Sequence, residues 1–474
     1  MKAIRDEDRT EAFKWLESIN KEWDGLCEMG VIEHGYSRRQ LREMGITTNP
    51  IPFSICLTYK HDKDGNIDRY KSRFALAGHS GNMQKGVHFD KTYASTPIQH
   101  TCKILQAIMV KHKLHRLTFD IKMAYCQADL PADQQIAVRY PEGLRQYDQQ
   151  TGEELFMVLR KNLYGHPAAG RIWEKERNKV LLDMFNKDGW TCKRSRKDPC
   201  MFLIKKGKVR TWAVIWTDDV DMVGEQEQVL KEIYRKINAT WECKLTDPEY
   251  MLGVKREIKK EGDEMTVELT MTAFIEAMAE AFKPHLLNRK VNTPLPDKLF
   301  LWRRRDTTDE EKLRVLDKGY QRLFGMLLWA ARGTFPECLL GTSMLGRMMS
   351  APTDEAWDAA VWMMTYIYQH RNRGIKFSST GNLEPVVYSD ASNKADPTDS
   401  KCQYGYIHIW MGGPIIATSR KLSHVGLSAA DNEYQAIHWA NRHTRWLREL
   451  LTEMEQADAV TNATITYGDN RAAN

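Results

Sequence analysis

The feature that most constrains this chain is the stretch 214–223, Val-Ile-Trp-Thr-Asp-Asp-Val-Asp-Met-Val, in which adjacent acids interrupt a run of apolar and β-branched residues. Alternating β-forming residues on both sides predict a hairpin whose tight turn carries Asp218 and Asp219. Taken alone, an Asp-Asp pair in a turn has a plain explanation, because aspartate bonds its own backbone and tolerates unusual dihedral angles. A chemical role for these acids therefore depends on what the rest of the chain places beside them.

The length and composition indicate a multidomain globular protein. The chain has 474 residues, 42% of them apolar, which is more than one hydrophobic core normally serves, so we expect two or three domains. No apolar run is long enough to span a bilayer, and the first residues lack the apolar stretch of a signal peptide, so we expect a soluble intracellular protein without membrane contact. Nine cysteines without a Cys-x-x-Cys pair argue against a disulfide framework or a structural zinc site.

Basic residues crowd the approach to the central hairpin, although the net charge of +6 is modest for this length. Such a cluster could attract a polyanion through phosphate contacts, or it could simply form a solvated face. Asp198 is the only acid among them, and the cations are Lys193, Arg194, Arg196, Lys197, Lys205, Lys206, Lys208 and Arg210.

The N-terminal part predicts a helix followed by a hairpin. Residues 10–32 form an amphipathic pattern with Leu16, Ile19, Trp23 and Leu26 on one face, which predicts a packing helix. Residues 51–60 and 68–77 read as paired strands around a turn cluster at 61–66.

Two cations lie two residues apart on the second of these strands, so Lys71 and Arg73 leave the same face. They either guard an exposed edge strand or clamp a polyphosphate, and the sequence leaves both interpretations open.

A third acid could join the pair in the central turn. Residues 98–113 read as a helix, and residues 115–120 read as a strand that ends in Asp120, with Tyr125 shortly after it. An acid in this place either caps the following element or overlooks a crevice. If Asp120 meets Asp218 and Asp219, the three carboxylates could hold two Mg²⁺ ions against a nucleoside triphosphate, whose tail the cations of the upstream strand would neutralise.

The last ninety residues predict a separate α/β unit with the order β-β-β-α-β. Strands end at Asp390 and Asp469, and a helix that begins at Ser428, with Asp431 at capping-box spacing, carries Glu433 on an apolar face. Three acids that met there would repel one another, and a pair of Mg²⁺ ions aligned for attack on a phosphodiester is the usual remedy. Spacing alone also allows the three never to meet. Two such clusters in one chain suggest a protein that both makes and degrades nucleic acid.

Between these units we expect a linker and a helical segment. Three prolines and the charged run 303–306 mark residues 284–312 as a linker, and residues 316–372 look almost wholly helical, with spacing typical of packing and no recognisable chemistry.

Short motifs in one order resemble the reverse transcriptase and ribonuclease H of copia-type LTR retrotransposon Pol polyproteins. The polymerase-like motifs are Arg69-Tyr70-Lys71-Ser72-Arg73, Phe119 to Tyr125, Pro141-Glu142-Gly143, Leu163-Tyr164-Gly165 with Arg171 and Trp173, and Trp216-Thr217-Asp218-Asp219. The downstream motifs are Tyr320 to Leu327, Met349 to Thr353, Ser389-Asp390-Ala391, Gly405-Tyr406, Gly412 to Ile415, Leu427-Ser428 with Glu433-Tyr434, and Asp469-Asn470. Each motif is short, and their shared order across nearly the whole chain carries the resemblance.

The resemblance implies an α/β and α+β multidomain fold: a right-hand polymerase of fingers, palm and thumb, then a helical connection and an RNase H-like α/β domain that lacks its C-terminal part. We expect the reverse transcriptase at 1–290, with fingers and palm at 1–224 and a thumb-like part at 225–290. A linker and helical connection would follow at 291–380, and the RNase H-like domain would occupy 381–474.

The resemblance also implies site residues and ligands. Asp120, Asp218 and Asp219 would be the catalytic acids that bind the polymerase Mg²⁺ or Mn²⁺, while Lys71 and Arg73 would bind the triphosphate and Tyr125 would exclude a 2′-hydroxyl. The nuclease acids, which would also bind metal ions, would be Asp390, Glu433 and Asp469. The implied partners are an RNA template, a DNA primer, an RNA-DNA hybrid and deoxynucleoside triphosphates. Expected locations are the cytoplasm, in a virus-like particle, and the nucleus. The sequence is compatible with a homodimer.

Several positions depart from the family pattern. Ala168 and Gly170 stand where the family generally has Gln and Pro, Thr217 stands where it usually has Val, and Asp221 replaces an apolar strand residue that Asp221→Leu would restore. The sequence also stops before the last nuclease acid of the family, so we expect weak or no ribonuclease H activity. The alternative to an active polymerase is a truncated or decayed retroelement protein that binds nucleic acid without catalysis. A stand-alone nuclease is disfavoured because it leaves the first 250 residues unexplained.

Overall fold

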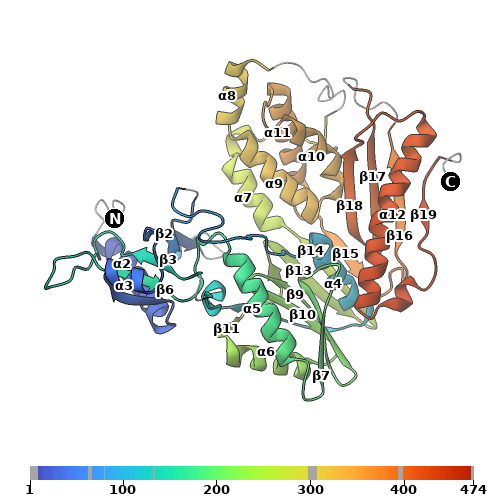
Figure 1. The fold of residues 1–474 in the computed structure, drawn as a ribbon. Coiled ribbons are helices and arrows are strands. Elements are labelled where there is room, and N and C mark those ends of the chain that lie inside the picture. The colour runs from blue at the N-terminus through green and yellow to red at the C-terminus, as the bar shows by residue number, and fades with distance from the viewer. Residues whose placement is uncertain are drawn as a thin grey trace.

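A computed structural model describes residues 9–61, 67–79, 81–131, 134–296, 307–392 and 399–470. It is a mixed α/β structure with four sheets and a cluster of helices (Figure 1). The predicted turn residues 62–66 and the charged run 303–306 lie outside the described residues. Within the described part of the chain, no helix is long and apolar enough to cross a membrane.

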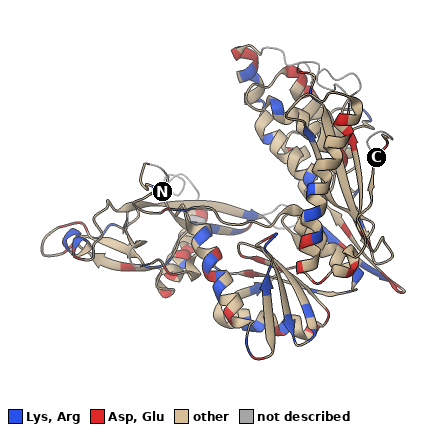
Figure 2. Ribbon diagram, turned by 45° about the vertical axis from the view of Figure 1, so that its right-hand side comes forward, with Lys and Arg blue, Asp and Glu red and all other residues tan. Residues whose placement is uncertain are grey.

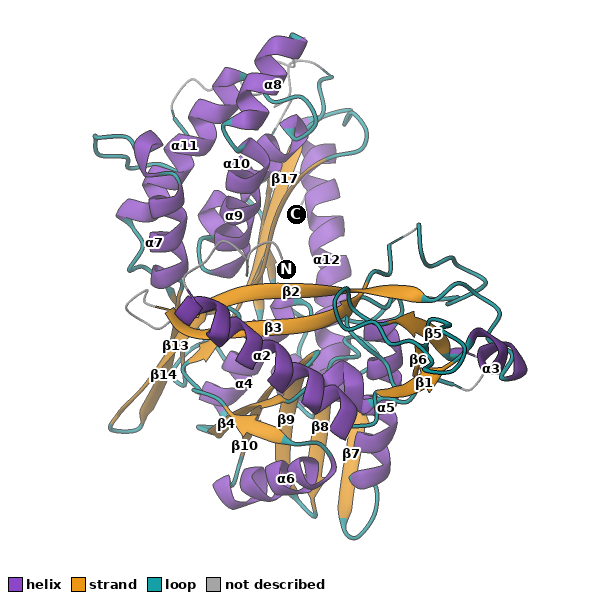
Figure 3. Ribbon diagram, turned by 90° about the vertical axis from the view of Figure 1, so that its left-hand side faces the viewer, coloured by secondary structure: helices purple, strands orange, loops and turns teal. Residues whose placement is uncertain are grey.

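The N-terminal unit is a five-stranded sheet with the order β1-β6-β5-β2-β3. Its strands are β1 (Ile32–Tyr36), β2 (Ile51–His61), β3 (Ile67–Leu76), β5 (Ile136–Arg139) and β6 (Phe156–Leu159), and its helices are α2 (Arg9–Glu28) and α3 (Arg38–Glu43). The predicted hairpin is confirmed, because β2 and β3 pair antiparallel, and β3 is the edge strand. Figure 3 shows α2 running along this ribbon.

The inward face of α2 differs from the predicted one by one residue. Leu16 is 46% exposed, whereas Trp15 is buried and its ring contacts the rings of Tyr59 and Tyr70. Ile19 and Leu26 are buried as predicted. The larger apolar surface of tryptophan explains the preference, since burial free energy grows with the area removed from water.

The central unit is a six-stranded antiparallel sheet with the order β11-β4-β10-β9-β8-β7. Its strands are β4 (His115–Ile121), β7 (Trp190–Arg194), β8 (Met201–Lys206), β9 (Val209–Trp216), β10 (Asp219–Gly224) and β11 (Cys243–Leu245). The helices α5 (Ala169–Met184) and α6 (Glu227–Thr240) share a hydrophobic cluster with one face, while α4 (Gln99–Lys111) packs on the other. The predicted hairpin at 214–223 is confirmed as β9 and β10.

A third sheet and a helical cluster follow. The sheet has the order β12-β13-β14-β15, with β12 (Tyr250–Met251), β13 (Val254–Glu261), β14 (Glu264–Thr270) and β15 (Ile375–Ser378). The helices that share one core are α7 (Thr272–Ala281), α8 (Asp309–Asp317), α9 (Tyr320–Gly333), α10 (Leu339–Leu345) and α11 (Asp354–Gln369). Residues 225–290 therefore form no unit of their own. In this segment β11 is a strand of the six-stranded sheet, α6 packs against that sheet, and α7 belongs to the helical cluster.

The C-terminal unit has the predicted order of elements. The strands β16 (Val386–Ala391), β17 (Gln403–Trp410), β18 (Gly413–Lys421) and β19 (Thr466–Tyr467) form a sheet, and α12 (Ala429–Glu453) precedes the short helix η6 (Ala457–Val460) and β19. The predicted cap is confirmed, because the Ser428 hydroxyl accepts a hydrogen bond from the Asp431 amide at 3.1 Å. The turn before β18 lies at Met411 and Gly412, which both have positive φ, so Gly413 already belongs to the strand.

The C-terminal unit shares a hydrophobic core with the central sheet. One cluster of buried residues joins α4, the far face of β8 and β9, the third sheet, β17, β18 and α12. Trp212 of β9 donates its indole N–H to the Met454 carbonyl at 2.8 Å, and Trp446 of α12 donates to the Lys197 carbonyl at 3.1 Å. The two units are therefore packed together rather than joined only by a linker.

The basic cluster before the hairpin is largely neutralised within the chain. Figure 2 shows both Lys and Arg (blue) and Asp and Glu (red) on the strands and helices of the central unit. Five of the eight cations pair with carboxylates, and two of these carboxylates lie on or just after α12. The pairs are Arg194–Glu174, Lys197–Glu449, Lys205–Glu455, Lys206–Glu232 and Arg210–Glu225. The cluster thus serves internal contacts. Most of the positive charge that could attract a polyanion is paired with carboxylates of this chain.

Candidate active sites

The turn between β9 and β10 consists of Thr217 and Asp218, and it is strained. Thr217 has φ of 57°, a left-handed conformation that β-branched residues rarely adopt. Two hydrogen bonds hold the turn: the Trp173 indole N–H donates to the Thr217 carbonyl at 2.7 Å, and the Ile121 amide donates to the Asp218 carbonyl at 2.9 Å. Strain that the surrounding structure maintains is typical of functional sites.

Three carboxylates gather at this turn. Asp219, the first residue of β10, pairs in register with Asp120 on β4, and Asp218 lies in the adjoining turn. Burial raises the pKa of Asp219 to about 6, with the Asp218 and Asp120 carboxylates adding to the shift. Burial and then the charge of Asp218 likewise raise the pKa of Asp120. The structure therefore brings the three predicted acids close enough to repel one another, which a bound cation would relieve.

The carboxylates of this trio are less tightly grouped than those of a compact metal site. Among the described residues, Asp120, Asp218 and Asp219 do not form a group whose ligand oxygens all lie within 4.8 Å of one another. The donors are nevertheless all carboxylates, the ligands that Mg²⁺ prefers, and their shared repulsion fits a divalent cation. The residues present thus suit the metal ions that the sequence predicts.

The two predicted cations of β3 act on these acids. The charges of Lys71 and Arg73 lower the pKa of Asp120 and of Asp218 against the effect of burial. Burial and the neighbouring Arg73 lower the pKa of Lys71 itself. β3 is an edge strand, but its cations act on the acidic turn, and this placement favours the polyphosphate interpretation over edge protection alone.

Aromatic rings and one further acid support this corner. Arg73 lies over the Tyr164 ring at 5.3 Å, and the Tyr125 ring meets Tyr164 edge-on with centroids 5.3 Å apart. Glu22 of α2 is half-buried. Burial raises its pKa, and the charges of Lys71 and Arg73 offset only part of that rise. Sequence reasoning missed Glu22, since its contact with β3 crosses about fifty residues of chain and its helix shows only a packing pattern.

Tyr125 lies beside the acids as predicted. It belongs to the short helix η1 (Ala124–Gln127) that follows β4. Burial raises the pKa of the Tyr125 hydroxyl, and the charge of Asp218 raises it further. The Tyr125 hydroxyl therefore lies near the Asp218 carboxylate of the acidic turn.

One departure from the family pattern has a packing reason. A side chain at Gly170, in the first turn of α5, would place its Cβ 3.1 Å from the Cβ of Ala94. Ala168 precedes this helix without a side-chain cap, and its amide donates to Nδ1 of His166 at 3.1 Å. The segment around Ala94 thus packs closely on the start of α5, where a larger residue would push it away.

Asp221, which the sequence left without a role, is the centre of a buried ion network. Its side chain is 3% exposed and pairs with Arg116 at 3.0 Å and with Arg256 at 2.5 Å, both also almost fully buried. Arg116 of β4 further donates to Gln106 of α4, and Arg256 of β13 donates to the Pro248 carbonyl at 2.8 Å. Asp221 therefore joins the six-stranded sheet to the third sheet, two residues along β10 from Asp219.

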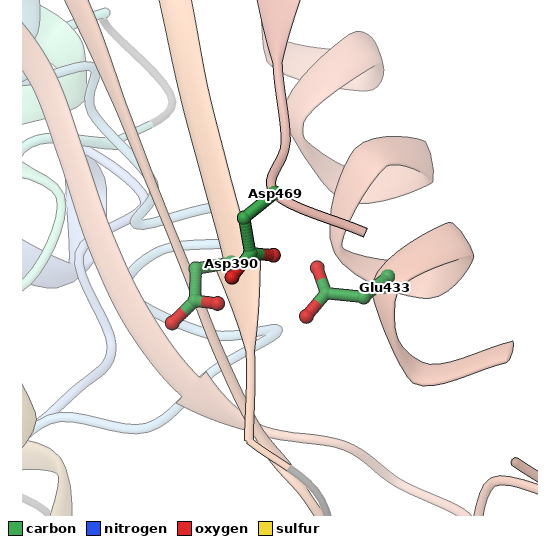
Figure 4. A group of neighbouring side chains, drawn as sticks. All are labelled: Asp390, Glu433 and Asp469. Atoms are coloured by element: carbon green, nitrogen blue, oxygen red, sulfur yellow. The ribbon is translucent and has the colours of Figure 1, made fainter. Parts of the chain in front are cut away.

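A second acidic cluster lies in the C-terminal unit (Figure 4). One ligand oxygen from each of Asp390, Glu433 and Asp469 lies within 4.8 Å of the other two. Glu433 is 6% exposed: its Oε1 accepts a hydrogen bond from the Ala391 amide at 3.1 Å, while its buried Oε2 has no partner. Burial raises the pKa of Glu433, and the other two acids add to the shift. A buried carboxylate oxygen without a partner fits a cation.

Two neighbouring cavities share part of their lining, and each lies near one of the two clusters. The first, of about 720 Å³, is lined by Trp216 of β9 and by Trp329 and Arg332 of α9. The second, of about 630 Å³, is lined by Asp390. Both are bordered by the same residues of η4 (Pro336–Cys338), α10 and β18, namely Pro336, Leu339, Ala417, Thr418 and Ser419. The two cavities therefore adjoin, one beside Trp216 at the end of β9 and the other beside Asp390.

Comparison with known proteins assigns the family. Residues 40–295, more than half of the chain, match the family described as reverse transcriptase (RNA-dependent DNA polymerase). The chain belongs to this family. The matched residues include the acidic turn, Asp120 and the cations of β3.

Three retrotransposon proteins are similar over most of the chain. The Retrovirus-related Pol polyprotein from transposon TNT 1-94 of Nicotiana tabacum is 25% identical over 446 residues, which are 93% of this chain and 32% of that protein. Those from transposons RE1 and RE2 of Arabidopsis thaliana are 25% and 24% identical, each over 88% of this chain and 27% of the relative. The resemblance to copia-type Pol proteins is confirmed, and the chain spans less than a third of the length of these relatives.

Proposed function

We propose that this chain is the RNA-directed DNA polymerase of a copia-type retrotransposon, with a C-terminal RNase H-like unit. The observation that carries the proposal is the meeting of Asp120, Asp218 and Asp219 at one strained turn, faced by Lys71 and Arg73. A protein that only bound nucleic acid would need neither buried, mutually repelling carboxylates nor the two hydrogen bonds that hold the turn.

The residues divide the work of nucleotidyl transfer. Asp120, Asp218 and Asp219 would hold Mg²⁺ or Mn²⁺, which stabilises the charge that develops on the attacking 3′-oxygen and the leaving pyrophosphate. Lys71 and Arg73 would bind the triphosphate of the incoming nucleotide, and Arg73 is held for this by its contact with Tyr164. A 2′-hydroxyl on the incoming sugar would collide with the Tyr125 ring, so deoxynucleotides are favoured.

The architecture supports a right-hand arrangement. The five-stranded sheet would be the fingers and the six-stranded sheet the palm. The helical cluster, which includes α7 but not α6 or β11, would act as the thumb, because Trp329 of α9 lines the cavity that reaches Trp216 beside the acidic turn. A template and primer lying across the palm could follow a path along β18 toward Asp390.

We also propose that Asp390, Glu433 and Asp469 hold a divalent cation and act on an RNA-DNA hybrid. The unpartnered Glu433 oxygen and the short spacing of the three ligand oxygens support this. Mn²⁺ binding measured by electron paramagnetic resonance should lose one class of sites in Asp390→Asn. Cleavage of a labelled hybrid, compared between the wild-type protein and that variant, tests the nuclease assignment.

The test of the polymerase is primer extension on an RNA template with Mg²⁺. We expect deoxynucleotide incorporation by the wild-type chain and none by the double variant Asp218→Asn/Asp219→Asn, since the metal ligands are then lost. Circular dichroism of the double variant establishes that it is folded. Equal incorporation by both proteins would contradict the proposal, and binding of the primer-template without incorporation by either would favour the alternative of a non-catalytic nucleic-acid-binding protein.

A further inference from the structure

Asp219 and Asp221 share one face of β10. They are two residues apart on a regular strand, so their side chains leave the same side of the sheet. In register on β4, Asp219 pairs with Asp120 and Asp221 pairs with Thr118. One of these two carboxylates belongs to the proposed metal site, and the other lies about 7 Å farther along the same face.

One guanidinium lies within electrostatic reach of both acids. Arg256 arrives from β13 in the third sheet, and its Nη1 lies 2.5 Å from Oδ2 of Asp221 while its Nη2 donates to the Pro248 carbonyl at 2.8 Å. Its charge also lowers the pKa of Asp219 against the larger, opposite effect of burial. Asp221 is therefore the ion-pair partner of Arg256, while Asp219 lies two residues along the same strand face.

We propose that Asp221 is a positioning residue whose carboxylate holds the Arg256 guanidinium and thereby keeps Asp219 free to bind a divalent cation. The inference rests on the proposed function, because it assumes that Asp219 is a metal ligand. Arg116 completes the arrangement: it pairs with the second oxygen of Asp221 and fixes that carboxylate from the β4 side. Asp221 thus has a role in this chain although its strand position is usually apolar in the family.

Loss of the Asp221 charge should redirect Arg256. A buried guanidinium without a carboxylate is strongly unfavourable, and an arginine binds a carboxylate well through its paired N–H groups. In Asp221→Asn, the neighbouring acid on the same face of β10 is Asp219, about 7 Å along the strand. An ion pair between Arg256 and Asp219 would compete with a divalent cation for Asp219. Removal of the arginine as well should remove this competition.

The test is Mn²⁺ affinity measured by electron paramagnetic resonance in the full chain carrying Asp390→Asn, so that the second cluster does not contribute. We expect Asp221→Asn to weaken Mn²⁺ binding by roughly tenfold or more, which is the effect of about 1.4 kcal/mol of competition. The double variant Asp221→Asn/Arg256→Gln should recover most of the affinity, and Arg256→Gln alone should not weaken it. Thermal unfolding of each variant is measured alongside.

The outcomes separate this inference from a structural role and from the polymerase assignment. If Asp221 only supports the fold, the affinity follows the melting temperature, and the double variant gains no affinity beyond any gain in stability. Unchanged Mn²⁺ affinity in Asp221→Asn, or no recovery in the double variant, would overturn the inference. Primer extension by the wild-type protein decides the proposed function independently: an inactive wild type overturns the polymerase assignment, whereas an active wild type whose Asp221→Asn variant keeps its Mn²⁺ affinity overturns the role of Asp221 alone.

Discussion

At the scale of single residues, Asp219 destabilises the metal-free fold once it is ionised. Its pKa is raised from 3.8 to about 6 by burial and by the neighbouring Asp218 and Asp120 carboxylates. The folded protein therefore favours the protonated acid, so this contribution to stability is complete below about pH 4 and is lost as the pH rises through about 6. In a chelator, Asp219→Asn should be more stable than the wild type at about pH 8 by roughly 1 kcal/mol, after discounting for solvent screening, and no more stable at about pH 4.

Urea unfolding of both proteins at the two pH values measures this difference. Addition of Mg²⁺ is the control, because binding to the wild type at about pH 8 should narrow the gap. A stability difference that is the same at both pH values would count against titration of Asp219 as its cause.

The charge of Asp221, unlike that of Asp219, stabilises the fold, because two buried arginines pair with it. Asp221→Leu restores the apolar residue usual in the family but leaves Arg116 and Arg256 without a carboxylate. We expect the free energy of unfolding to fall by about 3–5 kcal/mol, measured by urea denaturation. The matched control is Glu232→Gln, which breaks the more exposed pair with Lys206 and should cost at most about 1 kcal/mol. A stable Asp221→Leu protein would show that the network contributes little.

The sequence predicted which acids meet at each cluster, but it could not predict the partners of Asp221. Asp218 and Asp219 stand out as polar residues inside an apolar hairpin, and the alternation before Asp390 and Asp469 predicts equivalent places for them, although β16 ends at Ala391 and β19 already ends at Tyr467. The partners of Asp221 are 105 and 35 residues away in sequence, and one comes from another sheet. Such contacts depend on strand register and sheet packing, which local patterns do not encode.

At the scale of an element, the central hairpin was predictable in kind but not in strain. Alternating β-forming residues predicted the two strands, whereas nothing local indicated that Thr217 would take a positive φ. Thr217→Gly should relieve this conformation and stabilise the fold by about 1 kcal/mol, while Thr217→Val keeps the branched Cβ and should be nearly neutral. Thermal unfolding of the two variants checks this, and a glycine variant no more stable than the valine variant would contradict it.

The helix α2 illustrates a second limit at the same scale. Its extent and amphipathic character followed from spacing, yet the inward face was assigned to Leu16 instead of Trp15. A helix turns by 100° per residue, so neighbouring apolar residues on a broad face fit the same pattern almost equally well. Only the aromatic pair Tyr59 and Tyr70 on the facing ribbon decides between them.

At the scale of the whole molecule, the sequence indicated units separated by a linker, while the structure gives the C-terminal unit and the central sheet one core. The contact between Trp212 and Met454 spans 242 residues and leaves no trace in composition. We therefore expect the two units to unfold together, with one calorimetric transition that includes both. Leu451→Ala, a fully buried change in α12, should lower that single transition by an amount equivalent to about 2–5 kcal/mol.

The matched control for this whole-molecule prediction is Leu313→Ala on α8, whose side chain is 59% exposed and lies outside the shared core. It should leave the transition nearly unchanged. Near-ultraviolet circular dichroism and hydrogen exchange of β9 report on the central sheet, so both signals should shift with Leu451→Ala although the substitution lies on the other unit. Two separate transitions, with only the C-terminal one displaced, would mean that the shared core does not couple the central sheet to the C-terminal unit, and that the two unfold as independent domains.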